Sequence, residues 1–180
     1  MSEERKSWQN PEVILKDVGI EEGMTVADMG CGPGFFTLPI ASVVGEKGLV
    51  HAVDSNPAAL DMLRDRIRSD GMRKAIKIVR ADVAKTDISA SSVDMAFFAN
   101  VLHDIEDKRT FLSEVRRILM PEGVAVVVDW RKVNTPFGPP SEMRLSEDTV
   151  RALLQRNGFE DSGISLKAGP YHYGLVFRRK

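Results

Sequence analysis

The feature that most constrains the fold of this chain is a short apolar segment that ends in an acid and then repeats glycine at every second position. The run is Val26-Ala27-Asp28-Met29-Gly30-Cys31-Gly32-Pro33-Gly34-Phe35. Glycine lacks a Cβ atom, so such a stretch can adopt positive φ angles and bring its backbone close to a ligand. A helix expected over Phe35–Val44 would present free N–H groups at its start. We therefore predict a strand over Thr25–Met29 followed by a tight, ligand-facing turn.

Apolar clusters of strand length alternate with helical patterns along the chain, which is typical of a largely parallel sheet covered by helices on both faces. The predicted strands are Thr25–Met29, Leu49–Val53, Ile76–Arg80, Val93–Phe98 and Val124–Trp130, with a closing hairpin of Phe159–Lys167 and Tyr171–Arg178. The predicted helices are Asn10–Val18, Phe35–Val44, Pro57–Ser69, Asp107–Met120 and Ser146–Arg156. Residues 83–92 can hold at most a stub of helix, residues 121–123 are predicted as a turn, and residues 131–144 as a loop over the strand ends.

Length and charge narrow the possible partners. A chain of 180 residues suits one domain, and its formal net charge is −1. Proteins built around nucleic acid are usually strongly basic, so we expect no nucleic-acid partner. The apolar runs are too short to span a membrane and the polar N-terminus lacks a signal-peptide core, so we expect a cytoplasmic protein with no membrane partner. Cys31 is the only cysteine, which excludes a disulfide within the chain and a cysteine-based metal site, and we predict no metal.

The glycine spacing differs from that of a dinucleotide-binding turn. The fingerprint G-x-G-x-x-G places its third glycine one position later than Gly34, and Pro33 removes an N–H group from the turn. The negative charge of Asp28 is unfavourable for a pyrophosphate but suits a cationic ligand. An NAD(P)-dependent reductase is the first alternative, and it is disfavoured further because the two tyrosines, Tyr171 and Tyr173, form no Tyr-x-x-x-Lys pair.

The Asp-x-Gly-x-Gly-x-Gly run from Asp28 to Gly34 resembles the first motif of class I S-adenosylmethionine-dependent methyltransferases. S-adenosylmethionine carries an ammonium and a sulfonium, so its charge matches that of Asp28. The resemblance extends over nearly the whole chain, and the nearest group is the small-molecule methyltransferases similar to the ubiquinone and menaquinone biosynthesis enzymes. It implies a Rossmann-like α/β fold with a seven-stranded, mostly parallel sheet in the order 3-2-1-4-5-7-6, strand 7 being antiparallel. It also implies a single domain over residues 1–180, with residues 1–20 forming an N-terminal helix region that covers the cofactor site.

The same resemblance implies how S-adenosylmethionine is bound. Asp54 follows the second strand, 20 residues after Gly34, where an acid can accept hydrogen bonds from both ribose hydroxyls. The alternative is that Asp54 only caps the helix that starts at Pro57. Asp82 and the N–H of Val83 would meet the adenine, although acids are also common in turns. A carbonyl near Asn100 would contact the ammonium. The full predicted set is Asp28, Gly30, Gly32, Gly34, Phe35, Asp54, Ser55, Asp82, Val83 and Asn100.

The candidate catalytic residue is His103, which follows the fourth strand where the resemblance implies an opening toward a small-molecule acceptor. It can act as a general base or only line the pocket. Trp8 and the segment 171–173 supply aromatic rings for sheet packing or for the acceptor pocket, and strand alternation would place Tyr171 and Tyr173 on one face and His172 on the other. The predicted activity is methyl transfer to a small molecule, and a non-catalytic cofactor-binding module is the second alternative.

Overall fold

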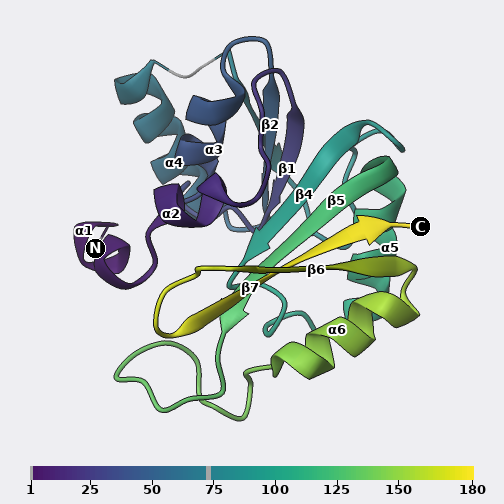
Figure 1. Ribbon diagram of the computed structural model, residues 1–180. Coiled ribbons are helices and arrows are strands. Elements are labelled where there is room, and N and C mark those ends of the chain that lie inside the picture. The colour runs from purple at the N-terminus through teal and green to yellow at the C-terminus, as the bar shows by residue number, and fades with distance from the viewer. Residues whose placement is uncertain (1, 72–73) are drawn as a thin grey trace.

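The computed structural model describes residues 2–71 and 74–180 and contains one seven-stranded sheet with helices on both faces (Figure 1). The strands run in the order β3-β2-β1-β4-β5-β7-β6, and β7 is antiparallel to both of its neighbours. The ladders between the first five strands are all parallel. The predicted strand order and the antiparallel seventh strand are therefore confirmed. The strands are β1 (Thr25–Met29), β2 (Leu49–Asp54), β3 (Ile76–Arg80), β4 (Val93–Ala99), β5 (Leu119–Trp130), β6 (Phe159–Leu166) and β7 (His172–Arg179).

Six helices accompany the strands within the described residues. The helices α2, α3 and α4 pack against one face of the sheet, and α5 and α6 pack against the other (Figure 1). Each face has its own buried apolar cluster. None of the helices in residues 2–71 and 74–180 combines the length and the apolar composition that a bilayer-spanning segment needs. The helices are α1 (Ser2–Trp8), α2 (Pro11–Lys16), α3 (Thr37–Val44), α4 (Pro57–Asp70), α5 (Lys108–Ile118) and α6 (Glu147–Arg156).

Three helix starts follow from short-range signals in the sequence. The side chain of Asn10 accepts hydrogen bonds from the first free N–H groups of α2, and the side chain of Asn56 does the same for α4. Each asparagine is followed by a proline, whose fixed φ suits the first helical position and whose missing N–H costs nothing there. Ser146 caps α6 by accepting from the N–H of Thr149, 3.2 Å away. The predicted starts of these three helices are confirmed.

Other predicted boundaries are wrong. The local sequence pattern predicts a helix only from Asn10, whereas helix α1 precedes that residue, inside the N-terminal helix region that the resemblance implies for residues 1–20. Helix α3 begins at Thr37 rather than at Phe35, because residues 30–34 form a turn closed by a hydrogen bond from the N–H of Gly34 to the carbonyl of Cys31. Residues 83–92 contain no helical stub.

The turn predicted at residues 121–123 lies inside β5 as an irregularity of the ladder. Leu119 pairs with Val93 of β4, and the next pair joins Val124 to Met95, so β5 has three more residues than its partner between these contacts. Glu122 takes up part of the excess with a φ of 61°. Such a bulge leaves both flanking stretches in register, which is why β5 starts five residues earlier than predicted.

A small aromatic group ties the N-terminal segment to the carboxyl end of β5. The ring of His172 stacks on Trp8 at 5.6 Å between centroids and 7° between planes, and it lies 4.1 Å from the ring of Trp130. His172 has no exposed surface, and neither ring nitrogen has a hydrogen-bond partner among the described residues. Burial, followed by the nearby cationic Arg5, lowers the pKa of His172 to about 3. The folded protein therefore holds this imidazole neutral.

The neutral state of His172 makes a prediction for acid stability. An unfolded histidine takes up a proton near pH 6.5, whereas the folded one does so near pH 3, so between these values the unfolded state binds more protons. The free energy of unfolding then falls as the pH falls, by up to about 1.4 kcal/mol per pH unit. His172→Phe should remove this contribution, so urea unfolding at pH 6.5 and pH 4.5 should show a smaller acid loss for the variant than for the wild type. Equal losses in the two proteins would contradict the prediction.

Candidate functional site

The glycine turn after β1 needs glycine for two different reasons. Gly30 has a φ of 80°, and a Cβ atom there would come within 2.4 Å of the side chain of Val101. Gly32 has a φ of 52°, but a Cβ atom there would meet no heavy atom within 4 Å. Packing therefore excludes a side chain at the first position, whereas the second faces open space where a ligand can approach the backbone.

The turn is attached to the end of the neighbouring strand by its N–H groups. The N–H groups of Gly30 and Cys31 donate to the carbonyl of Val53, at 2.8 and 3.0 Å. The N–H of Gly32 donates to Oδ2 of Asp54 at 2.8 Å, and Oδ1 of Asp54 accepts from the N–H of Asn56 at the same distance. Asn56 is the residue that caps α4, so the alternative role of Asp54 as a cap is wrong. A carboxylate has about four acceptor positions, which leaves Asp54 free to accept further donors.

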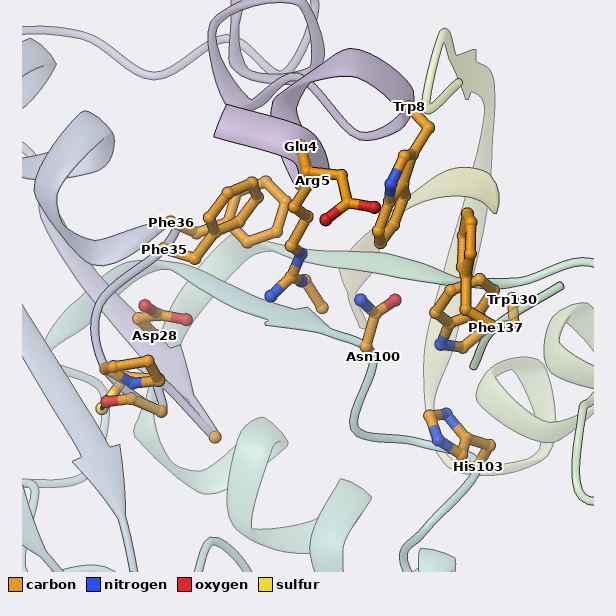
Figure 2. Close-up of a pocket in the computed structure, with 15 residues that line it drawn as sticks. Glu4, Arg5, Trp8, Asp28, Phe35, Phe36, Asn100, His103, Trp130 and Phe137 are labelled. Atoms are coloured by element: carbon orange, nitrogen blue, oxygen red, sulfur yellow. Dashed lines mark hydrogen bonds between the residues drawn. The ribbon is translucent and has the colours of Figure 1, made fainter. Parts of the chain in front are cut away.

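A cavity of about 480 Å³ opens at the carboxyl ends of β1, β4 and β5, beneath α1 (Figure 2). Parallel strands whose chain order reverses in the middle of a sheet leave a crevice at this edge, because the connections on either side run to opposite faces. The cavity is lined by Glu4, Arg5, Trp8, Asp28, Gly30, Cys31, Gly32, Pro33, Phe35, Phe36, Ala99, Asn100, His103, Trp130 and Phe137.

The structure brings part of the predicted site together in this cavity and leaves part beside it. The predicted residues in the lining are Asp28, Gly30, Gly32, Phe35, Asn100 and His103. The predicted residues outside the lining are Gly34, Asp54, Ser55, Asp82 and Val83.

The residues beside the cavity have their own contacts. Gly34 packs toward Leu63 of α4, 2.5 Å from where its Cβ atom would lie. The N–H of Ala81 donates to the carbonyl of Asp54, which holds the end of β3 against the end of β2. The carboxylate of Asp82 accepts from the N–H of Ala84 at 2.8 Å, as a turn acid does.

Asp28 supplies a buried carboxyl group to the cavity. Its side chain accepts a hydrogen bond from the hydroxyl of Thr37 at 2.6 Å and is 2% exposed. Burial raises the pKa of Asp28 to about 7, and the charge of Asp54 adds to this, whereas the Thr37 hydrogen bond and the charge of Arg5 act in the opposite direction. A cationic ligand in the cavity would favour the ionised carboxylate.

Arg5 brings a positive charge into the cavity from α1. Figure 2 shows its side chain descending from the helix, and its guanidinium lies 4.0 Å from the ring centroid of Phe35. Burial lowers the pKa of Arg5 to about 10, so the side chain keeps its charge at neutral pH. The guanidinium donates twice to Oε1 of Gln9, at 2.9 and 2.7 Å. The side chains of Gln9 and Asn100 then exchange hydrogen bonds at 3.1 and 3.4 Å, which joins α1 to the end of β4.

His103 is held in one orientation by a buried acid. Its Nδ1 lies 2.7 Å from Oδ1 of Asp129, and its backbone N–H donates to Oδ2 of the same carboxylate at 3.1 Å. The other ring nitrogen, Nε2, lies 3.3 Å from Oδ1 of the exposed Asp104. Burial lowers the pKa of His103, but the hydrogen bond and the charge of Asp129, with the charge of Asp104, outweigh it and raise the pKa above its usual value.

Aromatic rings form the wall of the cavity opposite the glycine turn. Phe137 stacks on Trp8 at 4.6 Å, and Trp130 lies 5.7 Å from Trp8. Tyr171 contacts Trp8 and Phe137 from outside, whereas Tyr173 is buried in the core on the α5 and α6 side. The prediction that the two tyrosines share a face is wrong, because Tyr171 lies in the bend before β7, where strand alternation does not apply.

Several residues that line the cavity or contact its lining are not predicted as site residues from the sequence. Asp129 ends an apolar strand, as Asp28 and Asp54 do, and this shared position is a signal that could have linked it to the same edge of the sheet. Arg5 and Phe137 carry no comparable signal, because they lie in polar or proline-rich segments and reach the cavity only through the tertiary fold. Cys31 also lines the cavity, but burial raises the pKa of its thiol, which keeps it protonated.

Comparisons with known proteins agree on one family. Residues 27–127 match the family model described as a methyltransferase domain. Demethylmenaquinone methyltransferase of Staphylococcus aureus (strain MRSA252) is 26% identical over 134 residues, which cover 74% of this chain and 54% of the relative, so the chain spans about half of that protein. The 2-phytyl-1,4-naphtoquinone methyltransferase of Trichormus variabilis is 28% identical over 88% of this chain and 68% of its own length. The crystal structure of a SAM dependent methyltransferase from Aquifex aeolicus is 30% identical, with a TM-score of 0.91, over 98% of this chain and 93% of that one.

The contact between His103 and Asp129 can be tested by titration. Asp129→Asn keeps the shape of the side chain but removes the charge that favours the imidazolium, so the pKa of His103 should fall. Imidazole C–H signals followed by NMR across the pH range report this directly, with His103→Gln identifying the resonance. The midpoint of His51, which lies on β2 away from this pair, serves as the control and should not move. An unchanged or higher midpoint for His103 in Asp129→Asn would show that the carboxylate does not hold the ring.

Proposed function

Because this chain belongs to the family of S-adenosylmethionine-dependent methyltransferases, we propose that it transfers the methyl group of that cofactor to a flat aromatic small molecule. The observation that carries the proposal is the composition of the cavity. One side is the glycine turn with Asp28, and the other side is a set of aromatic rings next to the His103–Asp129 pair.

The residues at the carboxyl edge of the sheet fit S-adenosylmethionine. The backbone at Gly32 faces open space that a side chain would enter, and Asp28 is a buried carboxyl group whose ionised form needs a cationic partner. When bound, S-adenosylmethionine supplies an electrophilic methyl group on a positively charged sulfur. Asp28 would stabilise the positive charge of the cofactor, and the uncommitted acceptor positions of Asp54 would take the ribose hydroxyls.

Further cofactor contacts follow from the same placement. Arg5 can pair with a carboxylate, because it is charged and, within the part of the chain that the structure describes, its guanidinium donates to the neutral side chain of Gln9 and to no acid. Asn100 lies at the point where α1 and the end of β4 meet, with its N–H committed to the carbonyl of Val128. Asn100 has a φ of 60°, and we propose that its backbone carbonyl accepts a hydrogen bond from the ammonium of the cofactor. Asp82, Val83 and Ser55 would contact the adenosine beside the cavity, and α1 would cover the methionine half.

The acceptor side favours an aromatic ring. Trp8, Trp130 and Phe137 present ring faces and edges that stack well on flat, conjugated molecules, and such contacts exclude water from the reacting atoms. Two relatives are named for methylation of demethylmenaquinone and of a 1,4-naphthoquinone. We therefore infer that the acceptor is a hydroxylated aromatic ring of this kind in its reduced form.

In the proposed reaction, His103 removes the proton that leaves the acceptor. Its Nδ1 proton is donated to Asp129, which leaves the lone pair of Nε2 free to accept a proton from an acceptor hydroxyl. The electron pair of the acceptor forms the bond to the methyl carbon as the bond from that carbon to sulfur breaks. The imidazolium that results is stabilised by Asp129 and can donate from Nε2 to Asp104, whose exposed carboxylate passes the proton to solvent.

A non-catalytic cofactor-binding module is the alternative class of function. The oriented histidine disfavours it, because a His–Asp pair held at the edge of the cavity is suited to taking up and releasing a proton, which cofactor binding alone does not require. The glycine spacing and the family match both disfavour a reductase.

The proposed function is tested by incubating the protein with methyl-labelled S-adenosylmethionine and reduced 1,4-naphthoquinone. Labelled naphthoquinone product should appear, and turnover should rise with pH through a midpoint above the usual histidine value, because only neutral His103 accepts a proton and its pKa is raised. His103→Ala should lower kcat by about 10²- to 10⁴-fold.

The control for this experiment is cofactor binding. Calorimetry with S-adenosylhomocysteine should give the same affinity for wild type and His103→Ala, which separates loss of chemistry from loss of the site. Binding without any labelled product from the wild type would contradict the proposed acceptor. Full turnover by His103→Ala would remove the histidine from the reaction.

A further inference from the structure

The loop of residues 131–144, which follows β5, carries one side of the aromatic wall. Most of its residues are exposed or half-buried, as expected of a segment with three prolines and one glycine. Phe137 nevertheless reaches the cavity, and Gly138 lies so close to Trp130 that a Cβ atom would come within 2.8 Å of the indole ring. Because few residues of this loop are buried, its position against Trp130 requires a specific set of contacts.

Unlike the rest of the loop, Arg144 is buried, with only 4% of its surface exposed. Its guanidinium makes five hydrogen bonds, each to an oxygen of the same loop. Nε donates to the carbonyl of Pro139 at 2.9 Å, and Nη1 donates to the carbonyls of Arg131 and Val133 at 3.1 and 2.8 Å. Nη2 donates to the hydroxyl of Thr135 and to the carbonyl of Phe137, at 2.5 and 3.3 Å.

These contacts use the whole donor capacity of the side chain. A guanidinium has five N–H groups, so none is left for a ligand. All five acceptors are uncharged, so the arginine does not serve to neutralise an acid. The planar fork of donors instead gathers carbonyl groups from residues 131 to 139 around one point, which a lysine with three donors cannot reproduce.

The same guanidinium is in contact with the aromatic wall. It lies 5.1 Å from the ring centroid of Trp130, within the range of a cation–π interaction. The carbonyl of Phe137 receives a hydrogen bond from Nη2 and another from the hydroxyl of Thr135, which is itself bonded to Arg144. The position of Phe137 in the cavity is therefore fixed through two routes that both start at Arg144.

We propose that Arg144 is a positioning residue that folds the 131–144 loop around itself and so sets the place of Phe137 and Trp130 as the acceptor-binding wall. It touches neither cofactor nor acceptor and acts through the two aromatic residues. The acceptor part of this inference rests on the proposed function, whereas the hold on the loop does not.

The first test measures the solvent access of the aromatic wall and needs no acceptor. The chain has two tryptophans, Trp8 and Trp130, and both line the cavity. Arg144→Lys keeps the charge but leaves at least two of the five oxygens without a donor, so the loop should loosen and acrylamide should quench tryptophan fluorescence more strongly, by about twofold. Arg117→Lys is the matched control, because Arg117 also bonds two backbone carbonyls, those of Thr86 and Ile88, but outside the cavity lining. It should leave quenching unchanged.

The second test separates acceptor binding from chemistry. With reduced 1,4-naphthoquinone as the probe, Arg144→Lys should raise the acceptor KM by about tenfold while kcat and the affinity for S-adenosylhomocysteine change little. Phe137→Ala should raise KM similarly. Because Arg144 acts in part through Phe137, the double variant should raise KM by clearly less than the product of the two single effects, which is a non-additive cycle.

Each outcome decides one part of the proposal. Unchanged quenching in Arg144→Lys, or an equal increase in Arg117→Lys, would overturn the hold on the loop. Effects of Arg144→Lys and Phe137→Ala on KM that multiply in the double variant would show that the arginine does not act through Phe137. If the wild type left reduced naphthoquinone unmethylated, the proposed acceptor would be wrong. The comparison of quenching between Arg144→Lys and Arg117→Lys would still decide whether Arg144 positions the aromatic wall.

Discussion

The hydrogen bond from the N–H of Gly32 to the carboxylate of Asp54 joins the ends of the two strands from which the site is built. Together with the two N–H groups that donate to Val53, it makes the glycine turn an extension of β2 as well as of β1. The turn cannot relax toward ordinary φ angles without breaking these contacts, and its path leaves Gly32 facing open space. The floor of the cavity and the free acceptor positions of Asp54 both depend on this attachment.

The rest of the site is brought to that floor by the topology of the sheet. The order reversal between β1 and β4 places Asp28, Asn100 and Asp129 at one edge, although a hundred residues separate the first from the last. Helix α1 closes the cavity from above through the chain of bonds between Arg5, Gln9 and Asn100. The resulting cavity has a polar, charged side and an aromatic side, which is the division that a charged cofactor and a flat acceptor require.

Much of the fold could be predicted from local patterns, because each pattern has a direct physical cause. Strands β1 and β3 have the predicted bounds, and the asparagine–proline pairs set the starts of α2 and α4. The bulge in β5 could not be predicted, because Pro121-Glu122-Gly123 is typical of a turn and only pairing with β4 draws it into a strand.

The candidate site was predicted on its cofactor side far better than on its acceptor side. Asp28 lies near the end of β1, Gly32 lies in the turn after it, and Asn100 directly follows β4, so strand ends that meet at one edge predict their proximity. Arg5 and Phe137 lie on segments whose position depends on distant contacts, such as the burial of Gln9 or the five hydrogen bonds of Arg144, and no local pattern reports these. The orienting role of Asp129 for His103 likewise exists only in three dimensions.

The central claim is that the cavity holds a cationic cofactor against the buried carboxyl group of Asp28, and its most direct test is calorimetry with S-adenosylmethionine at two pH values. The pKa of Asp28 is raised to about 7 in the free protein, and the cation binds the ionised form. Binding should therefore be about eightfold weaker at pH 6 than at pH 7.5, with release of a proton at the lower pH, and Asp28→Asn should bind weakly and without this dependence. Affinity that is independent of pH in the wild type and retained in Asp28→Asn would contradict the account.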